Sequence, residues 1–296
     1  MKGTLKKPEW IKTRIPAGKH FQQINALNQH TGLATVCEEA RCPNQWECWK
    51  QGTATFMLMG DTCTRSCRFC SVKTARHPSG PDPMEPDHLA ETIKTLQLKY
   101  AVLTTVDRDD LSDYGAGHIL TCVDRIKAVN PSVMIELLVP DFQGDETCIR
   151  RIAESQAEVV GHNLECTRRL TQIVRDPRAG YEQSLQVLKL LSQFNPTLIT
   201  KSSLMLGFGE MDDEVLEAME DILGSGVEIL TLGQYLQPGK HNIPVAEYVH
   251  PDKFECFREQ GLKMGFEYIA AGPLVRSSYM AAEHYLKLRL SRQGKS

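Results

Sequence analysis

Six of the ten cysteines in this 296-residue chain lie close together, in two groups of three. The first group has the spacing C-x4-C-x5-C and the second has C-x3-C-x2-C. The members are Cys37, Cys42 and Cys48 in the first group, and Cys63, Cys67 and Cys70 in the second. A structural tetrahedral metal site is completed by four protein ligands, whereas a reactive site keeps one position open. Two sets of three thiolates therefore predict two metal clusters, each with a coordination position that cysteine does not fill.

Disulfide bonding, zinc binding and simple burial suit the six cysteines less well. Disulfide frameworks are typical of small secreted chains, and the start of this chain has no apolar leader segment. Zinc ribbons usually carry paired C-x2-C knuckles, a spacing that only Cys67 and Cys70 have. Burial as inert thiols suits the scattered cysteines in apolar segments, which are Cys122, Cys148, Cys166 and Cys256. The two groups have polar neighbours instead, which favours metal ligation.

The second cysteine group, with Phe69 directly before its third member, resembles the signature of the radical S-adenosylmethionine (SAM) superfamily. Together with VRSSYMA at Val275–Ala281, the first group makes the chain similar to the lipoyl synthase family. The likeness runs from KPEWIKTRIP through GDTCTRSCRFCSVKTAR, VLTTVDRDDL, VRDPRAGYEQSL and LTLGQYLQP to AGPLVRSSY. It implies a [4Fe–4S] cluster on each cysteine group, with SAM chelating the fourth iron of the cluster on the second group.

The resemblance also implies an activity, that of a sulfurtransferase in lipoate biosynthesis. Cleavage of SAM would yield a 5′-deoxyadenosyl radical, and the auxiliary cluster on the first cysteine group would donate sulfur. The acceptor would be carbons 6 and 8 of an octanoyl-lysine on a lipoyl carrier domain, of the glycine cleavage H protein or 2-oxoacid dehydrogenase E2 type. Further implied partners are a ferredoxin or flavodoxin as electron donor and an iron–sulfur carrier. A cytoplasmic location is expected, with a mitochondrial or plastid one after presequence removal as the alternative.

Site residues outside the cysteines follow from the same resemblance. The fourth ligand of the auxiliary cluster is expected from RSSY, at Ser278 with Ser277 as second choice; a spare cysteine would also serve chemically. A hard serine oxygen binds iron more weakly than a thiolate does, which suits a cluster that gives up sulfur. The two serines could instead cap a helix that begins near residue 280. SAM is expected to contact four polar residues, for which turn roles are the alternative: Thr105, Asp107, Asn163 and Glu165.

Apolar runs alternate with amphipathic helical stretches from residue 53 onward, which indicates a parallel α/β sheet. The predicted strands are Thr53–Met59, Tyr100–Val106, Val133–Val139, Glu158–Gly161, Thr197–Leu206 and Glu228–Leu232. Predicted helices are Asp87–Leu98, His118–Val129, Tyr181–Phe194 and Asp212–Leu223. The pattern does not separate an open sheet from a barrel. The resemblance implies a partial (β/α)6 TIM-type barrel at 53–240, an N-terminal extension at 1–52 carrying the auxiliary cysteines, and a C-terminal extension at 241–296 with RSSY.

Polar or glycine-bearing motifs follow the predicted strands, namely CTRSCRFC, DRDD, PDF, HNLE, GFGE and GQYLQP in chain order. Ligands bind beyond the carboxyl ends of strands in such folds, so these motifs are expected at one rim. GFGE lacks the full phosphate-loop pattern. Arg65 and Arg68 are expected to lower nearby thiol pKa values or to be solvated. Arg175 and Arg178 face either substrate or solvent, and Lys201 is either a functional residue or half of an ion pair.

Composition argues against two classes of partner. The net charge is −3 and no basic stripe is present, so nucleic acid is not expected. No apolar run approaches the roughly 18 residues of a membrane span. Two rival functions stay open: another radical enzyme whose auxiliary cluster transfers electrons, and a non-catalytic binding module stapled by metal.

Overall fold

The structure, a computed structural model, describes residues 6–11, 34–35 and 53–278. Its strands are β1 (Ala34–Thr35), β2 (Thr53–Leu58), β3 (Thr62–Cys63), β4 (Lys73–Thr74), β5 (Tyr100–Thr105), β6 (Met134–Leu138), β7 (Val159–Gly161), β8 (Ile199–Leu206), β9 (Ile229–Gln234) and β10 (Tyr268–Gly272). Eight of them form one sheet in the order β1-β2-β5-β6-β7-β8-β9-β10, and β3 pairs with β4. Within that sheet β2 to β10 run parallel, and β1 lies antiparallel to β2.

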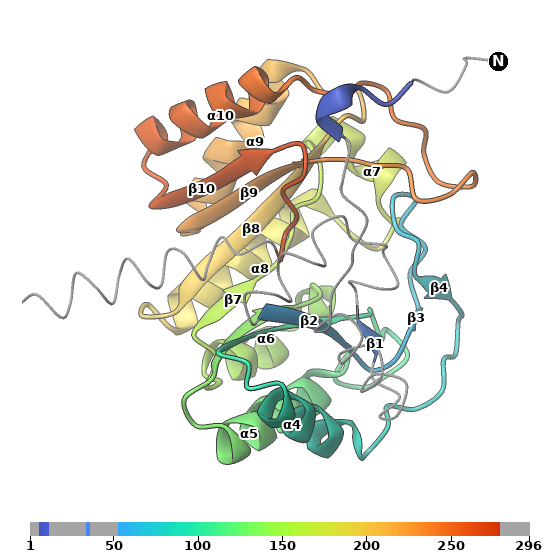
Figure 1. Ribbon diagram of the computed structural model, residues 1–296, viewed down its shortest axis with the longest axis vertical. Coiled ribbons are helices and arrows are strands. Elements are labelled where there is room, and N and C mark those ends of the chain that lie inside the picture. Colours follow the sequence, from blue (N-terminus) through green and yellow to red (C-terminus); the bar gives the residue numbers. More distant parts are fainter. Residues whose placement is uncertain (1–5, 12–33, 36–52, 279–296) are drawn as a thin grey trace, which may run out of the picture.

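Helices cover the outer face of the curved sheet (Figure 1). They are α4 (Glu85–Thr95), α5 (Ala116–Val129), α6 (Glu146–Ala153), α7 (Thr171–Val174), α8 (Tyr181–Phe194), α9 (Asp212–Gly224) and α10 (Pro251–Met264), with the short turns η1 (Glu9–Ile11), η2 (Phe142–Gly144) and η3 (Arg168–Leu170). Among the described strands, β1 and β10 are the two open edges of the sheet. This arrangement confirms the predicted partial α/β barrel.

All six predicted strands are present, with ends that differ by at most two residues. β10 is an additional parallel strand, in register with β9 from Tyr268–Ile229 to Gly272–Gly233. Its sequence, YIAAG, is short and rich in alanine, and only Ile269 is fully buried. A strand of this kind lacks the continuous run of large apolar residues on which the prediction relied. The segment after residue 240 therefore contributes to the sheet of the barrel.

The predicted helices are confirmed as α4, α5, α8 and α9. α8 has the predicted ends, whereas α4 begins two residues earlier than predicted, with Pro86 in its first turn, where a missing N–H costs nothing. α5 also begins two residues early, after Gly115 in a left-handed conformation with φ +87°. α9 includes Gly224, which was expected just after the helix. The ends of helices are thus the least accurate part of the prediction.

The apolar core has two layers. The outer layer lies between the helices and the sheet, and the inner layer lies inside the barrel. The inner layer consists of Tyr100, Val102, Val159, Ile199 and Ile229, with partly buried neighbours from β6 and β10. In barrels of this type ligands bind at the rim where the strands end, so the site is expected there.

Candidate functional site

The second cysteine group lies in the segment that follows β2. Cys63 ends β3, and Cys67 and Cys70 lie between β3 and β4. Backbone N–H groups already point at two of its sulfurs. Cys63 Sγ accepts from the N–H groups of Arg65 at 3.4 Å and Asp107 at 3.3 Å. Cys67 Sγ accepts from the N–H of Asp176 at 3.3 Å. Such contacts stabilise a sulfur that carries negative charge, as a metal-bound thiolate does.

Burial raises the pKa of the cysteine thiols. The pKa of Cys63 rises to about 12, mainly because the thiol is removed from water and secondly because Asp107 carries negative charge. Removal from water likewise raises the pKa of Cys67 to about 12 and raises that of Cys70. Metal binding must therefore displace protons from these thiols. A cluster of several metal ions carries positive charge, which can stabilise three buried thiolates together.

Another group of side chains that could bind a metal ion lies outside the cysteine loop. Within the described part of the chain, one group of three candidate ligands has all its ligand atoms within 4.8 Å of one another, and it consists of Glu85, His118 and Cys122. In that group Glu85 Oε2 lies 2.5 Å from His118 Nε2 and accepts the N–H of Met59 at 3.0 Å, so the carboxylate is already hydrogen-bonded. The three sulfurs of the cysteine loop are not all within that distance of one another.

Arg65 is the most constrained side chain of the cysteine loop. Its guanidinium is 3% exposed and forms two-point contacts with both Asp109 and Asp141 at 2.7 to 2.9 Å. Burial alone would raise the pKa of Asp141, but the hydrogen bonds and charge of Arg65 hold it at about 2. The backbone N–H of Arg65 lowers the pKa of Cys63, as expected, but removal of the thiol from water outweighs this effect. The alternative that Arg65 is solvated is wrong, because its side chain is buried between carboxylates.

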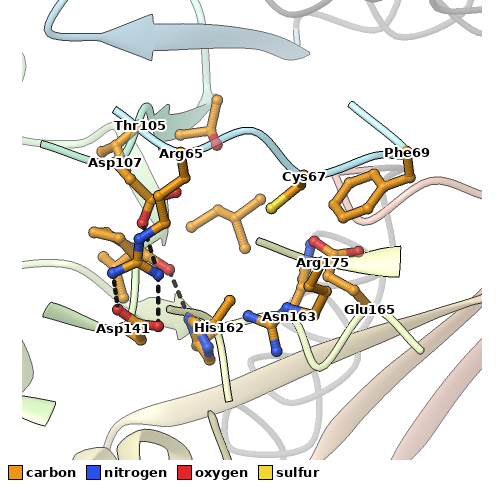
Figure 2. Close-up of a pocket in the computed structure, with 15 residues that line it drawn as sticks. Arg65, Cys67, Phe69, Thr105, Asp107, Asp141, His162, Asn163, Glu165 and Arg175 are labelled. Atoms are coloured by element: carbon orange, nitrogen blue, oxygen red, sulfur yellow. Dashed lines mark hydrogen bonds and ion pairs between the residues drawn. The ribbon is translucent and has the colours of Figure 1, made fainter. Parts of the chain in front are cut away.

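A polar cavity opens beside Cys67 at the carboxyl ends of β5, β6 and β7. In Figure 2 Cys67 and Phe69 lie on one side, with Asn163, Glu165 and Arg175 close by. The four residues expected to contact SAM all line this cavity: Thr105, Asp107, Asn163 and Glu165. They come from two different strand ends, so the fold brings together positions that are about sixty residues apart in the sequence.

Glu165 has a backbone conformation that is rare for its residue type. Its φ is +73°, in the left-handed region, and its backbone bonds Ser203 O and Met205 N on β8. Its Oε1 accepts from Asn163 Nδ2 at 3.0 Å, and removal from water raises the pKa of its carboxyl group. Strained residues cluster at ligand sites. The conformation turns a carboxylate into the cavity that a regular strand would direct elsewhere.

His162 lines the same cavity but was not singled out in the sequence. It is 4% exposed, and its Nδ1 and Nε2 lie 2.9 Å from Val139 O and Ser184 Oγ. Burial, and secondly the charge of Arg175, lowers its pKa to about 4. The ring is therefore neutral near pH 7. The position of His162 in HNLE, directly after a predicted strand, could have indicated a site residue. The position of Asp141 in PDF could have indicated the same.

The two arginines of VRDPR have different surroundings. Arg175 is 6% exposed, lines the cavity, and donates to Ser184 Oγ at 2.8 Å. Arg178 is partly exposed and donates to Thr64 O at 2.8 Å and to Asp176 Oδ1 at 2.8 Å. Neither is simply a solvated loop residue, because one faces the cavity and the other binds the backbone of the cysteine loop.

GFGE does not offer its amides to a ligand. The N–H groups of Gly207 and Phe208 donate to the Glu210 carboxylate at 2.5 and 2.9 Å. A carboxylate thus occupies the position that a bound phosphate would need, in agreement with the incomplete motif.

Ser277 and Ser278 are half-buried turn residues that follow β10. The segment before them crosses the end of β9, where a Cβ on Gly233 would lie 2.2 Å from Val275 O. The side chain of Arg276 adds a contact from Nη1 to Gln234 O at 3.4 Å. Glycine at position 233 therefore lets the chain turn back over the carboxyl end of β9, the same rim that carries the cysteine loop. Cys37, Cys42 and Cys48 lie outside the described residues.

A membrane-spanning helix is not found: none of the described helices is both long and apolar enough to cross a bilayer.

Comparisons with known proteins show the family of the chain. Residues 57–222 match the model of the radical SAM superfamily, and residues 1–42 match that of the N-terminal domain of lipoyl synthase of the radical SAM family. The chain is 53% identical over 288 residues to a lipoyl synthase of Anaeromyxobacter sp. (strain Fw109-5), covering 97% of this chain and 98% of that protein. It is 52% identical over 294 residues to a mitochondrial lipoyl synthase of Branchiostoma floridae, covering 98% of this chain and 78% of that protein.

A solved structure with a similar fold is the FeFe-hydrogenase maturase HydG from Carboxydothermus hydrogenoformans. The TM-score is 0.58 at 13% identity, over 84% of this chain and 64% of that one. At this identity the likeness concerns the fold, which is the partial α/β barrel described above.

Proposed function

The chain belongs to the lipoyl synthase family of the radical SAM superfamily, and on that basis we propose that it inserts two sulfur atoms, at carbons 6 and 8, into an octanoyl chain on a lysine of a lipoyl carrier domain. It is a sulfurtransferase of the radical SAM type. The observation that carries the proposal is the position of the cysteine loop, whose middle sulfur borders a polar cavity at the rim of the barrel.

The proposed ligands of the radical cluster are Cys63, Cys67 and Cys70. When bound, the clusters and SAM supply an electron, a 5′-deoxyadenosyl radical and sulfur. This loop would hold one cluster locally, with Cys67 at the border of the cavity. N–H groups of Asp107 and Asp176 stabilise the sulfurs, and Arg65 fixes the loop between them.

The proposed SAM contacts are the polar side chains that converge on the cavity. Glu165 can accept hydrogen bonds from ribose hydroxyls, and Asn163 can both donate and accept. Thr105 and Asp107 lie across the cavity from them, next to Arg65 (Figure 2). Neutral His162 has both ring nitrogens in contact with protein atoms, so we assign it a positioning role.

The auxiliary cluster is proposed to bind Cys37, Cys42, Cys48 and Ser278. The cysteines lie in the segment 1–52 and the serine in the segment 241–296, which also contributes β10 to the sheet of the barrel. The path of the chain over Gly233 supports Ser278, because it brings RSSY to the rim with the cysteine loop. Labile serine ligation favours sulfur donation, whereas ligation by four thiolates would favour the rival role of electron transfer. The proposed partners are an octanoylated carrier domain, a ferredoxin or flavodoxin, and an iron–sulfur carrier.

The decisive experiment is a single turnover under anaerobic conditions with an octanoyl-lysine peptide. For the wild-type chain we expect dithiolated product, with the loss of one of two clusters as it forms. Ser278→Ala should still cleave SAM and form no product, whereas Ser277→Ala, its matched control, should form product. Full product from Ser278→Ala would exclude the serine role. SAM cleavage without sulfur insertion by the wild-type chain would instead favour the electron-transfer alternative, and zinc in place of iron would favour the binding module.

A further inference from the structure

The segment Val174–Arg178 lies alongside the cysteine loop and hydrogen-bonds to it along its length. Val174 O accepts from the N–H of Arg68 at 2.9 Å. At the other end, Arg178 Nη2 donates to Thr64 O at 2.8 Å. Between these two contacts lies Asp176, which is hydrogen-bonded to Ser66 and Cys67 of the loop. The two segments are more than a hundred residues apart in the chain, so these contacts are made only by the folded barrel.

Asp176 contacts the loop through both its backbone N–H and its side-chain carboxylate. Its N–H donates to Cys67 Sγ at 3.3 Å, and its Oδ2 accepts from the N–H of Ser66 at 2.9 Å. The side chain is 4% exposed and is also bonded by Arg178 Nε at 2.8 Å. Pro177 follows and restricts the backbone of Asp176 to extended conformations. Both the donor and the acceptor are thus fixed in direction.

All of these contacts are between protein atoms, so they do not depend on a bound cluster. Ordering a residue costs conformational entropy, so a free loop that must wrap a cluster loses this entropy on binding. A loop that is already ordered by the protein does not. Cys67, the middle ligand, is the cysteine whose neighbours on both sides are hydrogen-bonded to the segment, through Ser66 and Arg68.

We propose that Asp176 is a positioning residue that holds the loop from Cys63 to Cys70 in its ligating conformation before iron arrives, and that aims its own N–H at the Cys67 sulfur. The inference rests on the proposed function only in taking these cysteines as cluster ligands. It has a second consequence for the cluster when bound. Hydrogen bonds to sulfur favour the reduced state, in which the sulfurs carry more negative charge, so this contact raises the reduction potential.

The test uses the full chain, purified anaerobically, and compares Asp176→Asn and Asp176→Ala with wild type. Asp145→Asn is the matched control, because Asp145 Oδ1 accepts a backbone N–H of Cys148 at 2.8 Å at the start of α6, away from the cysteine loop. Three quantities are measured: the rate of iron loss to a chelator, hydrogen exchange of amides 64–70 after iron removal, and the potential of the cluster whose electron paramagnetic resonance signal responds to SAM.

For Asp176→Ala we expect loop amides to exchange about tenfold faster or more and iron to leave several times faster, because the loop loses a hydrogen bond to a charged group. Both substitutions remove the negative charge of Asp176, which by itself makes the potential more positive, so the potential of Asp176→Ala is compared with that of Asp176→Asn and should be the more negative of the two. In amide exchange and iron loss Asp176→Asn, which keeps one acceptor oxygen, should fall between Asp176→Ala and wild type, and it decides the question if Asp176→Ala does not fold. The control should behave as wild type.

Unchanged loop exchange in both Asp176 variants would overturn the proposal, as would an equal change in Asp145→Asn. None of the three measurements uses an octanoyl substrate. If the wild-type chain inserts no sulfur, the proposed function fails while the exchange rates still judge the role of Asp176.

Discussion

Lys201 Nζ lies 2.5 Å from Glu136 Oε1 inside the barrel, where both side chains are at most 4% exposed. Tyr100 OH donates to the other oxygen of Glu136 at 2.6 Å. The lysine is therefore half of a buried ion pair, one of the two alternatives that the sequence left open. Tyr100 belongs to the inner apolar layer, and neither Lys201 nor Glu136 lines the polar cavity.

Breaking this pair should be costly, because it leaves one charge buried without a partner. Lys201→Met alone should lower the free energy of unfolding by about 3–5 kcal/mol. The double variant Lys201→Met, Glu136→Leu should recover much of that loss, since a buried ion pair can often be replaced by apolar side chains. Urea denaturation of the single and double variants measures the coupling. If the two substitutions simply add, the pair is not the source of the cost.

Replacing Arg65 by lysine should uncouple the cysteine loop from the barrel. A single ammonium group cannot make two-point contacts with both Asp109 and Asp141, although the charge is kept. We expect less iron per chain and SAM cleavage slower by about tenfold or more, the effect of losing a charge-assisted two-point contact. Arg125→Lys is the control, because Arg125 pairs with Asp87 at an exposed site. Wild-type iron content and cleavage in Arg65→Lys would refute the assignment.

His162 makes stability depend on pH between about 4 and 6.5. Its pKa is lowered to about 4 in the folded chain, so over this range the unfolded chain binds more protons. The contribution of His162 to the free energy of unfolding is therefore fully present above pH 6.5. It decreases as the pH drops toward 4, by about 3 kcal/mol in all. His162→Gln, which cannot titrate, should flatten this part of the profile. Denaturant midpoints measured from pH 4 to 7.5 check the slope, and equal slopes in both chains would contradict it.

The order of elements could be predicted from the sequence because parallel strands are buried on both faces. Runs such as Tyr100–Thr105 have no polar face, and the helices between them have one apolar stripe. β10 escaped prediction because its residues are small and half-buried. What made it a strand is the exposed edge of β9, which is a property of the assembled sheet and not of the segment.

The proposed metal ligands of the site were easier to predict than the residues that position them. Spacing alone groups Cys63, Cys67 and Cys70, since short separations place them in one loop. Nothing local indicates that Arg65 meets Asp141, or that Asp176 meets Ser66, because these pairs form only when distant strand ends reach one rim. The rule that chemistry follows strand ends selects the right loops but cannot pair their side chains.

Substituting the middle cysteine should remove one cluster and leave the other. Cys67→Ala should keep about half of the wild-type iron if each cysteine group holds one [4Fe–4S] cluster of equal size. SAM cleavage should be lost, because the sulfur of Cys67 borders the cavity that Glu165 and Asn163 line. Cys256→Ala is the control, since Cys256 is an exposed thiol on α10. Iron analysis and detection of 5′-deoxyadenosine under anaerobic conditions are the measurements, and undiminished SAM cleavage by Cys67→Ala would separate this loop from the radical chemistry.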